Sequence, residues 1–461
     1  MKQQFLAFLT AAAAAAVSLA LATPVHAVVE LAKPADSFVD SIGVNTHYGN
    51  SIYVGGNAYA NPAIDAKLAE LGVRHLRDHT WNDTGLARID GLYSSYAVRT
   101  HLILGETTRS PADLVNLLKA HPAYEGIEGL NEPDFNTRSW NGFTDNPATN
   151  SYGGTRAFQN ELYAAVKADP LTQDRTILSP AMGNSARSQY LAPISFDVAA
   201  LHSYPSGREP TFNLDTQIAN MSTLRGTAPA KPLMSTETGY YNEPAADDGS
   251  IPEHIAGKYM PRLFAEYFNR GVQRTYSYEL ADQGPDLTQR EQNFGLLRYD
   301  LTEKPAFTAI ENLIDLVEEP DAPDGFTPSS LDYAINSTDV ALHHTLLQKS
   351  DGTFYLMLWQ ERPGFNRFAN GGLGSDIDVA PLPITLTLGT DVALARVFFP
   401  NDSALPAAMY ANPDLLNLNV LDKMMVVALT PVPEPASSAI LPAAAGALLL
   451  RRRRQQRRRD S

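Results

Sequence analysis

The sequence contains no cysteine and only three tryptophans in 461 residues. Without cysteine the chain can form no disulfide, so its stability must come from its core, for which roughly 400 residues are ample. Basic residues are also scarce, because 36 Lys and Arg stand against 51 Asp and Glu, and the formal net charge is -15. An acidic surface repels phosphates, so this balance argues against nucleic acid as a partner and favours a neutral one.

The first 27 residues have the parts of a secretory signal peptide. They combine one early lysine, Lys2, with a long apolar run and a small-residue cleavage site at Val25-His26-Ala27. We therefore expect an exported protein whose mature chain begins near Val28.

The other end of the chain carries Val-Pro-Glu-Pro at 432–435, an apolar run at 439–450 and a cluster of arginines. It resembles the PEP-CTERM sorting signal of Gram-negative bacteria, which implies an exosortase-type processing peptidase as partner and a place at the cell surface or in the extracellular matrix. The apolar run is shorter than the roughly 20 residues of a stable span, so we expect only transient membrane anchoring. A basic tail that binds nucleic acid is the alternative, but no basic or aromatic residues elsewhere support it.

Short β-rich runs alternate with helix-like segments through the middle of the chain. The helix-like segments include PAIDAKLAELG and SPADLVNLLKAHP, and several end at a Gly or Pro. Eight such units over about 280 residues predict an α/β fold, the (β/α)8 TIM barrel. A doubly wound sheet is the alternative, yet no Gly-rich phosphate loop follows the first strand. The predicted strands are 40–48, 73–79, 98–106, 126–132, 176–182, 196–204, 232–239 and 273–280.

Past residue 320 the pattern changes to strands without helices between them. Stretches of period 2, broken by turn-rich segments, predict a small antiparallel β-sandwich packed on the barrel. The strands fall at 331–337, 340–350, 353–362, 382–389, 394–400 and 424–431. The predicted organisation is a signal peptide at 1–27, a catalytic barrel at 28–320, a β-sandwich at 321–430 and a sorting tail at 431–461.

Two glutamates stand at the ends of predicted strands four and seven. Glu132 lies in Asn131-Glu132-Pro133, and Glu237 lies in the segment STETG. Active sites of TIM barrels lie at the carboxyl ends of the strands, and strands four and seven face each other across the mouth. A retaining glycosidase needs two carboxyl groups about 5 to 5.5 Å apart. The positions therefore predict a catalytic pair, although Asn-Glu-Pro also suits a turn and Glu237 could instead neutralise a buried arginine.

Further polar side chains on the same strand ends are candidate binding residues. His202 and Tyr204 alternate on strand six and share a face, from which they could orient Glu237, contact a sugar or simply pack. Arg77 ends strand two, where it could hold Glu237 ionised or form a structural ion pair. Weaker candidates for the pocket wall are Asn45, His47 and Tyr278.

The tryptophans give a separate indication of the ligand. Trp81 and Trp140 follow strands two and four, so each is either a platform for a sugar ring or an anchor for its loop, while Trp359 belongs to a core strand. His47 and His202 are poor metal-ligand candidates, because no acidic or histidine cluster has ligand spacing. We expect neither a metal nor another cofactor.

The middle of the chain resembles glycoside hydrolase clan A, the retaining (β/α)8 enzymes that include families 39 and 5. The resemblance covers about residues 38–318 and implies that Glu132 is the acid/base, Asn131 a ligand of the sugar 2-hydroxyl and Glu237 the nucleophile. The expected function is cleavage of β-type bonds in a poly- or oligosaccharide. The alternative is an inactive carbohydrate-binding or exopolysaccharide matrix protein on the same fold, against which the presence of both glutamates argues. The resemblance rests on Asn131-Glu132-Pro133, Glu237-Thr238-Gly239, His202-Ser203-Tyr204-Pro205 and the segment NFGLLRYDLTEKPAF at 293–307.

Overall fold

The computed structural model describes residues 28–49, 58–79, 82–242 and 249–433. The predicted signal peptide, Trp81 and nearly all of the predicted sorting tail lie outside these ranges. Among the described residues, no helix combines the length and the apolar character that crossing a bilayer requires.

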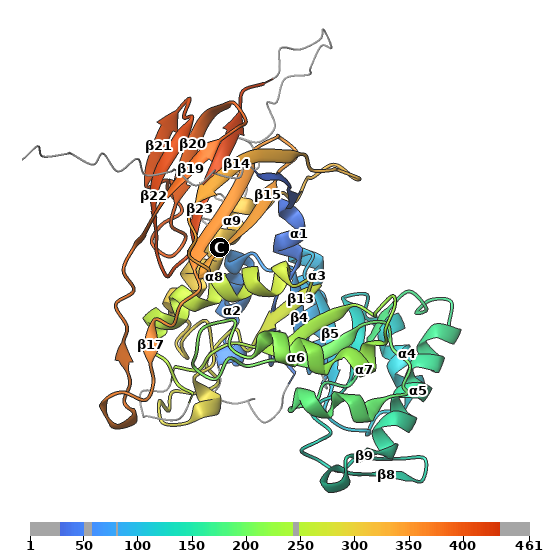
Figure 1. Ribbon diagram of the computed structural model, residues 1–461. Coiled ribbons are helices and arrows are strands. Elements are labelled where there is room, and N and C mark those ends of the chain that lie inside the picture. Colours follow the sequence, from blue (N-terminus) through green and yellow to red (C-terminus); the bar gives the residue numbers. More distant parts are fainter. Residues whose placement is uncertain (1–27, 50–57, 80–81, 243–248, 434–461) are drawn as a thin grey trace, which may run out of the picture.

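Eight parallel strands form a barrel, and each of them falls within or overlaps one of the eight predicted strands (Figure 1). Their order is β10-β6-β5-β4-β3-β13-β12-β11, and the two ends of this order meet at a bridge between Leu178 and Val198. The predicted fold class is thereby confirmed. The strands are β3 (Ile42–Thr46), β4 (His75–Asp78), β5 (Arg99–Leu104), β6 (Tyr124–Leu130), β10 (Thr176–Leu178), β11 (Ala199–His202), β12 (Leu233–Thr238) and β13 (Arg274–Ser277).

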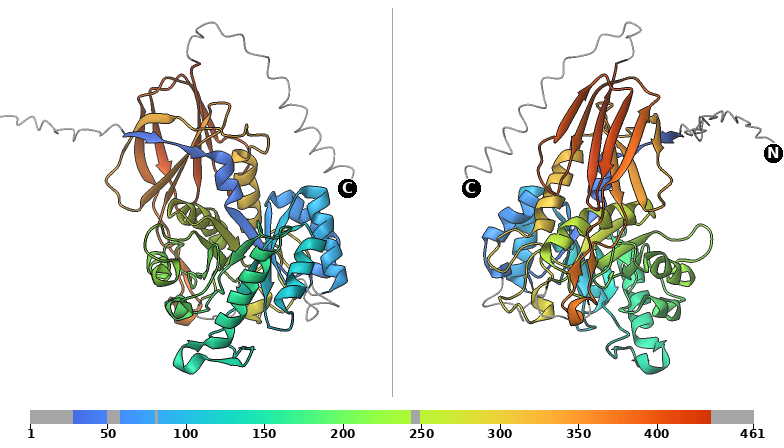
Figure 2. Two further views of the ribbon diagram at one scale, coloured as in Figure 1. Left: turned by 90° about the vertical axis from the view of Figure 1, so that its right-hand side faces the viewer. Right: turned by 60° about the vertical axis from the view of Figure 1, so that its left-hand side comes forward.

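Helices cover the outside of the barrel, and local sequence sets where several of them begin and end (Figure 2). Ser110 and Asp113 form a reciprocal capping box at the start of α4, with Pro111 in the first turn. Helix α2 ends at Gly72, whose φ of 80° is the left-handed conformation that favours glycine. The helices are α1 (Ala35–Asp40), α2 (Ala63–Leu71), α3 (Asp83–Tyr96), α4 (Pro111–Ala120), α5 (Gly153–Ala168), α6 (Leu214–Asn220), α7 (Ser222–Arg225), α8 (Glu253–Asn269) and α9 (Pro305–Val317).

Two sheets form the predicted sandwich, with strand orders β1-β14-β19-β22 and β2-β15-β16-β23-β20-β21, and all their pairs are antiparallel except the parallel pair of β2 and β15. Each sheet takes one short strand from the N-terminal segment before the chain enters the barrel, and in Figure 2 this blue segment lies beside the orange strands. The apolar side chains of the two sheets pack into a separate core. The strands are β1 (Val28–Leu31), β2 (Lys33–Pro34), β14 (Ser330–Asn336), β15 (Leu342–Gln348), β16 (Phe354–Gln360), β19 (Leu382–Leu388), β20 (Val392–Phe398), β21 (Ala408–Ala411), β22 (Leu415–Val420) and β23 (Met425–Pro431).

The sandwich is attached to the barrel through α8. Arg262 and Glu361 form a buried ion pair with 2.7 Å between Nη2 and Oε2, and Arg262 Nη1 donates to the Asp422 carbonyl at 2.9 Å. Lys258 forms a second pair with the Asp422 carboxylate at 2.8 Å.

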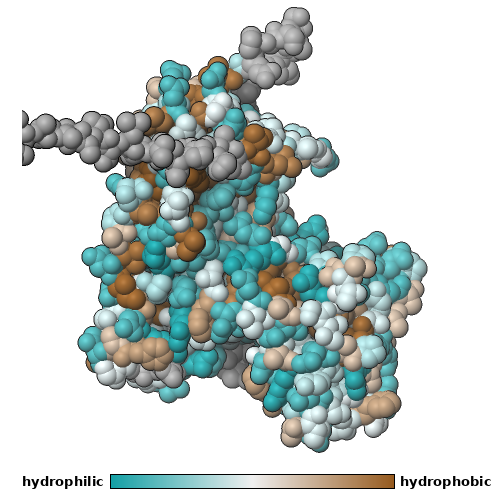
Figure 3. All heavy atoms as spheres, viewed as in Figure 1, coloured by the Kyte–Doolittle hydropathy of each residue, from teal (hydrophilic) through white to brown (hydrophobic). Residues whose placement is uncertain are grey.

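Over the face seen in Figure 3 the surface is largely hydrophilic, and hydrophobic residues occur there in small groups.

Candidate active site

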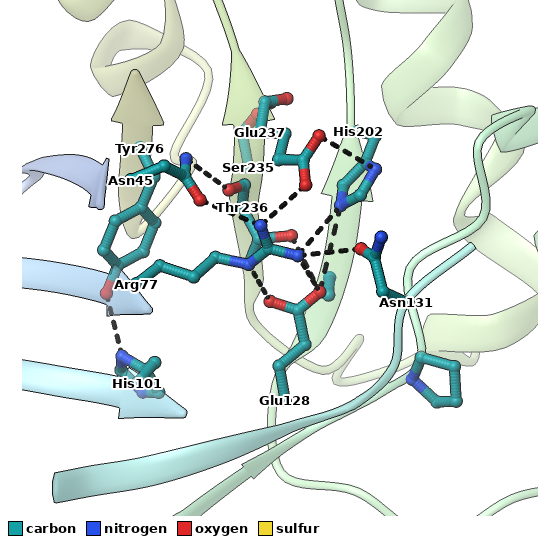
Figure 4. A network of polar contacts seen from close by, with 12 residues as sticks. Asn45, Arg77, His101, Glu128, Asn131, His202, Ser235, Thr236, Glu237 and Tyr276 are labelled. Carbon is teal, nitrogen blue, oxygen red and sulfur yellow. Dashed lines mark hydrogen bonds and ion pairs between the residues drawn. The ribbon is translucent and has the colours of Figure 1, made fainter. Parts of the chain in front are cut away.

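Arg77, on β4, lies at the centre of a polar network in the mouth of the barrel (Figure 4). Its Nη1 donates to Glu237 Oε1 at 2.7 Å, while Nε and Nη2 donate to the two oxygens of Glu128 at 2.6 and 3.0 Å. Burial opposes its charge, but the two carboxylates outweigh burial and raise the Arg77 pKa further above its usual range. The sequence suggested two alternatives for Arg77, a contact with Glu237 or a structural ion pair. Arg77 makes both, the second of them with Glu128.

Glu237, on β12, is held by donors on two sides. Besides the Arg77 bond, the Tyr204 hydroxyl donates to its Oε2 at 2.9 Å. Burial raises the pKa of Glu237, but the charges of His202 and Arg77 and the two hydrogen bonds outweigh burial and lower it. The carboxylate is thus kept ionised in a site where only 11% of its side chain is exposed.

The backbone around Glu237 departs from regular sheet geometry. The register between β11 and β12 shifts between Leu201 and His202, so that His202 pairs with Glu237. The Ser203 amide then donates to the Glu237 carbonyl at 3.0 Å. Irregularities of this kind re-aim side chains at barrel rims, and here His202 and Glu237 come to face one another.

Glu132 lies two residues past the end of β6 and adopts a strained backbone conformation. Its φ of 44° lies in the left-handed region, which costs a non-glycine residue about 1 to 2 kcal/mol. Two hydrogen bonds hold it there, because its amide donates to the Ala181 carbonyl at 2.9 Å and its carbonyl accepts from the Phe135 amide at 3.0 Å. Its side chain is 26% exposed, and its carboxyl group points to His202.

His202 lies among three carboxyl groups. Its Nδ1 donates to Glu132 Oε1 at 2.9 Å and lies 3.6 Å from Glu237 Oε2, while Nε2 is 3.8 Å from Glu128 Oε1. Burial lowers the His202 pKa, but the glutamates more than compensate and raise it to about 9. At neutral pH His202 is therefore a second cation beside Arg77.

Two asparagines support Arg77 from either side. Asn45, on β3, accepts from Arg77 Nη1 at 2.8 Å and donates to the carbonyl groups of Thr236 at 3.1 Å and Ser277 at 3.3 Å, so it ties its own strand to β4, β12 and β13. Asn131 accepts from Arg77 Nη2 through Oδ1 at 3.0 Å. Its amide nitrogen therefore lies on the side away from Arg77 (Figure 4).

His47 and Tyr278 belong to a neighbouring cluster around Glu279, just past the end of β13. His47 Nε2 lies 3.1 Å from Glu279 Oε2, to which the Tyr59 hydroxyl donates at 2.9 Å. Gln283 donates to Glu279 Oε1 at 2.7 Å and to the Tyr278 hydroxyl at 3.1 Å. Burial lowers the His47 pKa, but Glu279 outweighs burial and raises it. This cluster lies beside the glutamate pair, and the charge of Glu237 also acts on His47.

Trp140 makes the contacts of a loop anchor. It lies in β7 (Ser139–Trp140), which pairs with β8 (Phe143–Asn146) in a hairpin after β6. Its Nε1 donates to Glu161 at 2.8 Å, and its ring meets the edge of Phe158 at 5.0 Å between centroids, both on α5. The second predicted platform, Trp81, lies outside the described residues.

Four buried residues of the site were not predicted. Glu128 is the most important, because it is fully buried and shares Arg77 with Glu237. A signal for it exists, since a charged residue within an apolar strand must find a buried partner. No pattern in the sequence distinguished the other three, which are Tyr59, Glu279 and Gln283.

Within the described ranges, one group of side chains has the spacing of a metal site. Glu132, His202 and Glu237 each offer a ligand atom, and these atoms lie within 4.8 Å of one another. Both oxygens of Glu237 already accept hydrogen bonds, from Arg77 and Tyr204, and a cation there would face the Arg77 charge. The arrangement therefore fits a proton-handling carboxyl pair better than it fits an ion.

The architecture that this chain shares with solved glycoside hydrolases is a (β/α)8 barrel with an appended β-sandwich. No protein family and no curated protein matches at the sequence level. Similar solved structures are a family 39 glycoside hydrolase from Bacteroides cellulosilyticus WH2 (14% identity, TM-score 0.58, 86% of this chain and 81% of that chain) and a monomeric beta-xylosidase from Caulobacter crescentus CB15 (13%, 0.58, 87% and 98%). The GH39 enzyme from Xanthomonas axonopodis pv. citri is similar too (15%, 0.54, 87% and 96%). The chain thus has the fold of family 39 glycoside hydrolases.

Proposed function

We propose that the protein is an exported retaining glycoside hydrolase that cleaves β-type bonds of a poly- or oligosaccharide. The observation that carries the proposal is the approach of Glu132 to Glu237, with a carboxyl oxygen of each within 4.8 Å. Retaining enzymes hold their two carboxyl groups about 5 to 5.5 Å apart, whereas inverting ones leave about 6.5 to 9.5 Å for a water molecule. The short separation therefore favours a double displacement.

Glu237 is the nucleophile in this proposal. Arg77 and Tyr204 engage one oxygen each, which fixes the orientation of the carboxylate, and its lowered pKa keeps it ionised. In the first step a Glu237 oxygen forms a bond to the anomeric carbon as the bond to the leaving oxygen breaks. Glu132 gives its proton to that oxygen, and in the second step Glu132 takes a proton from the water that releases the sugar.

The charges in the mouth suit this division of labour. Arg77 and His202 supply two positive charges, and ionised Glu128 and Glu237 balance them. The lowered pKa of Glu237 is the direction that an ionised nucleophile requires.

Other parts of the proposal rest on the sequence. Asn131 adjoins the acid/base and presents its amide away from Arg77, as a ligand of the sugar 2-hydroxyl would. The signal-like start and the PEP-CTERM-like end support export to the cell surface or matrix, with an exosortase-type peptidase processing the tail. No step of the mechanism uses a cofactor.

The purified protein should be incubated with plant, algal and bacterial polysaccharides, and the products read by mass. Xylan and xylo-oligosaccharides belong in the panel, because one of the similar structures is named a beta-xylosidase. Release of shorter sugars that stops in Glu132→Gln and Glu237→Gln supports the proposal. Proton NMR of the first product should show the β-anomer. Binding without release would favour the inactive matrix protein, and an α-anomer would contradict retention.

A further inference from the structure

We propose that Phe135 is the platform of the subsite that holds the leaving group, and that the enzyme therefore selects substrates whose leaving group carries a flat apolar face. A pyranose ring or an aromatic aglycone has such a face, whereas a small leaving group has none. The inference rests on the proposed function and names the side of the cleaved bond on which selection takes place.

Phe135 is an exposed aromatic residue placed beside the proposed acid/base. It is 64% exposed, and its amide donates to the carbonyl of Glu132 at 3.0 Å in a tight turn. An exposed phenylalanine by itself has no meaning, since single apolar residues are common on protein surfaces. What suggests a binding role for Phe135 is the position of its ring relative to the Glu132 side chain.

Gly183, in the loop after β10, shows how close the ring and the carboxyl group lie. A Cβ atom at this glycine would stand 2.3 Å from Phe135 Cε2, 2.4 Å from Cζ and 3.2 Å from Glu132 Oε1. The edge of the ring and the oxygen of the acid thus border the same small space, which only glycine leaves open. A group bonded to the glycosidic oxygen at Glu132 comes directly against this ring.

Asp134 fixes the turn that carries the ring. This residue is buried, and its two carboxylate oxygens accept from the amides of Gly183 at 2.9 Å and Asn184 at 3.0 Å. The turn that carries Glu132 and Phe135 is therefore tied to the loop after β10 at several points. A rigid aromatic surface loses little conformational entropy on binding, which favours its use in recognition.

The side of the bond follows from depth in the mouth. Glu237, which bonds to the retained sugar, has 11% of its side chain exposed, and Glu132, which protonates the leaving oxygen, has 26%. Phe135 continues this outward series at 64%. The retained sugar therefore lies deep, at Glu237, and the leaving group extends outward past Glu132 and over the Phe135 ring.

The test compares two substrates that share the same retained sugar: an oligosaccharide, whose leaving group is a ring, and the glycosyl fluoride, whose leaving group is small. In Phe135→Ala, kcat/KM for the oligosaccharide should fall about five- to tenfold while the fluoride changes by less than about twofold. Phe135→Trp should retain the activity on the oligosaccharide. Phe143→Ala is the matched control, since Phe143 is 59% exposed on the β8 hairpin and should leave both rates unchanged.

The outcomes distinguish a wrong assignment of Phe135 from a wrong assignment of the hydrolase function. Equal losses on both substrates in Phe135→Ala, or no loss on the oligosaccharide, would overturn the assignment of Phe135 while wild-type turnover upheld the hydrolase. Wild-type protein that cleaves neither substrate would instead refute the proposed function, and the leaving-group subsite with it. Thermal melting of each variant verifies that the fold is retained.

Discussion

Glu128→Gln tests the charge network on a residue that lies too deep to contact substrate. Glu128 is fully buried, and the charges of Arg77 and His202 and the hydrogen bonds with Arg77 outweigh the cost of burial and lower its pKa from 4.5 to about 2. A displacement of this size corresponds to about 3 kcal/mol of stability at neutral pH. The cost of breaking a buried ion pair by removing one partner, about 3 to 5 kcal/mol, gives a similar figure.

The pH dependence of the loss identifies its cause. A depressed carboxyl pKa contributes stability above the unfolded value, and this contribution is lost as the pH falls through the folded value. The difference in unfolding free energy between wild type and Glu128→Gln should therefore be about 3 kcal/mol at pH 7 and about 1 kcal/mol near pH 3. Urea denaturation followed by circular dichroism measures both. A difference that is below about 1 kcal/mol at pH 7, or equal at both pH values, would refute the assignment.

Two companion variants sharpen this experiment. Arg77→Met alone leaves two buried carboxylates without their cation and should destabilise more than Glu128→Gln. The double variant should lose less stability than the sum of the two single losses, because Glu128→Gln removes a carboxylate that Arg77→Met leaves without its ion-pair partner.

Glu128→Gln should also change the kinetics. The acid limb of the pH profile of kcat/KM should move to lower pH, since Arg77 then interacts with Glu237 alone. An unmoved limb would mean that Arg77 does not set the ionisation of the nucleophile.

Four further predictions concern the pair, the histidine, the loop and the tail. With azide and an activated substrate, Glu237→Ala should give a glycosyl azide of inverted configuration and Glu132→Ala one of retained configuration, and swapped products would reverse the two roles. The raised His202 pKa contributes stability that is complete below about 6.5 and lost as the pH rises through about 9, so His202→Gln should flatten stability over this window, and an unchanged slope would contradict the charge assigned to it. Trp140→Ala should lower the melting temperature and reduce the rates on long and short substrates equally, whereas a loss confined to long substrates would show a sugar platform. Deleting 434–461, which spares the hydrogen bond of Val432 to Asp391, should release the protein to the medium with unchanged specific activity, and a folded but inactive product would refute a sorting role.

The barrel was predictable because its signals are local. The strands are short β-rich runs that alternate with helical patterns, and several helices end at a Gly or Pro, so the order of elements follows from the sequence alone. Strands β1 and β2 carry no such signal of their partners, because they pair with β14 and β15, more than 250 positions later in the sequence. Strand β21 is a short and largely exposed edge strand that no apolar run marks, whereas the alternating residues of β22 carry a strand signal that was overlooked.

The site was predictable where charged and polar residues stand at the ends of the predicted strands. Glu132 and Glu237 follow from their positions on strands four and seven, and the structure brings Arg77, His202 and Tyr204 around them. The part that Glu128 plays in the site could not be predicted, because the partner of a buried charge depends on which strands face each other across the barrel mouth.

The two proposed catalytic groups stand where the backbone departs from its regular form. Glu132 has a left-handed conformation that its residue type disfavours, and Glu237 lies at a register shift between β11 and β12. Neither irregularity has a local cause in the sequence, and the Glu132 conformation is held by a hydrogen bond to Ala181, outside its own strand. A regular strand end would point each side chain along the pleat rather than toward His202. The energetic cost of these two backbone irregularities therefore accompanies the approach of the two carboxyl groups. Departures from local conformational preference are expected at functional sites.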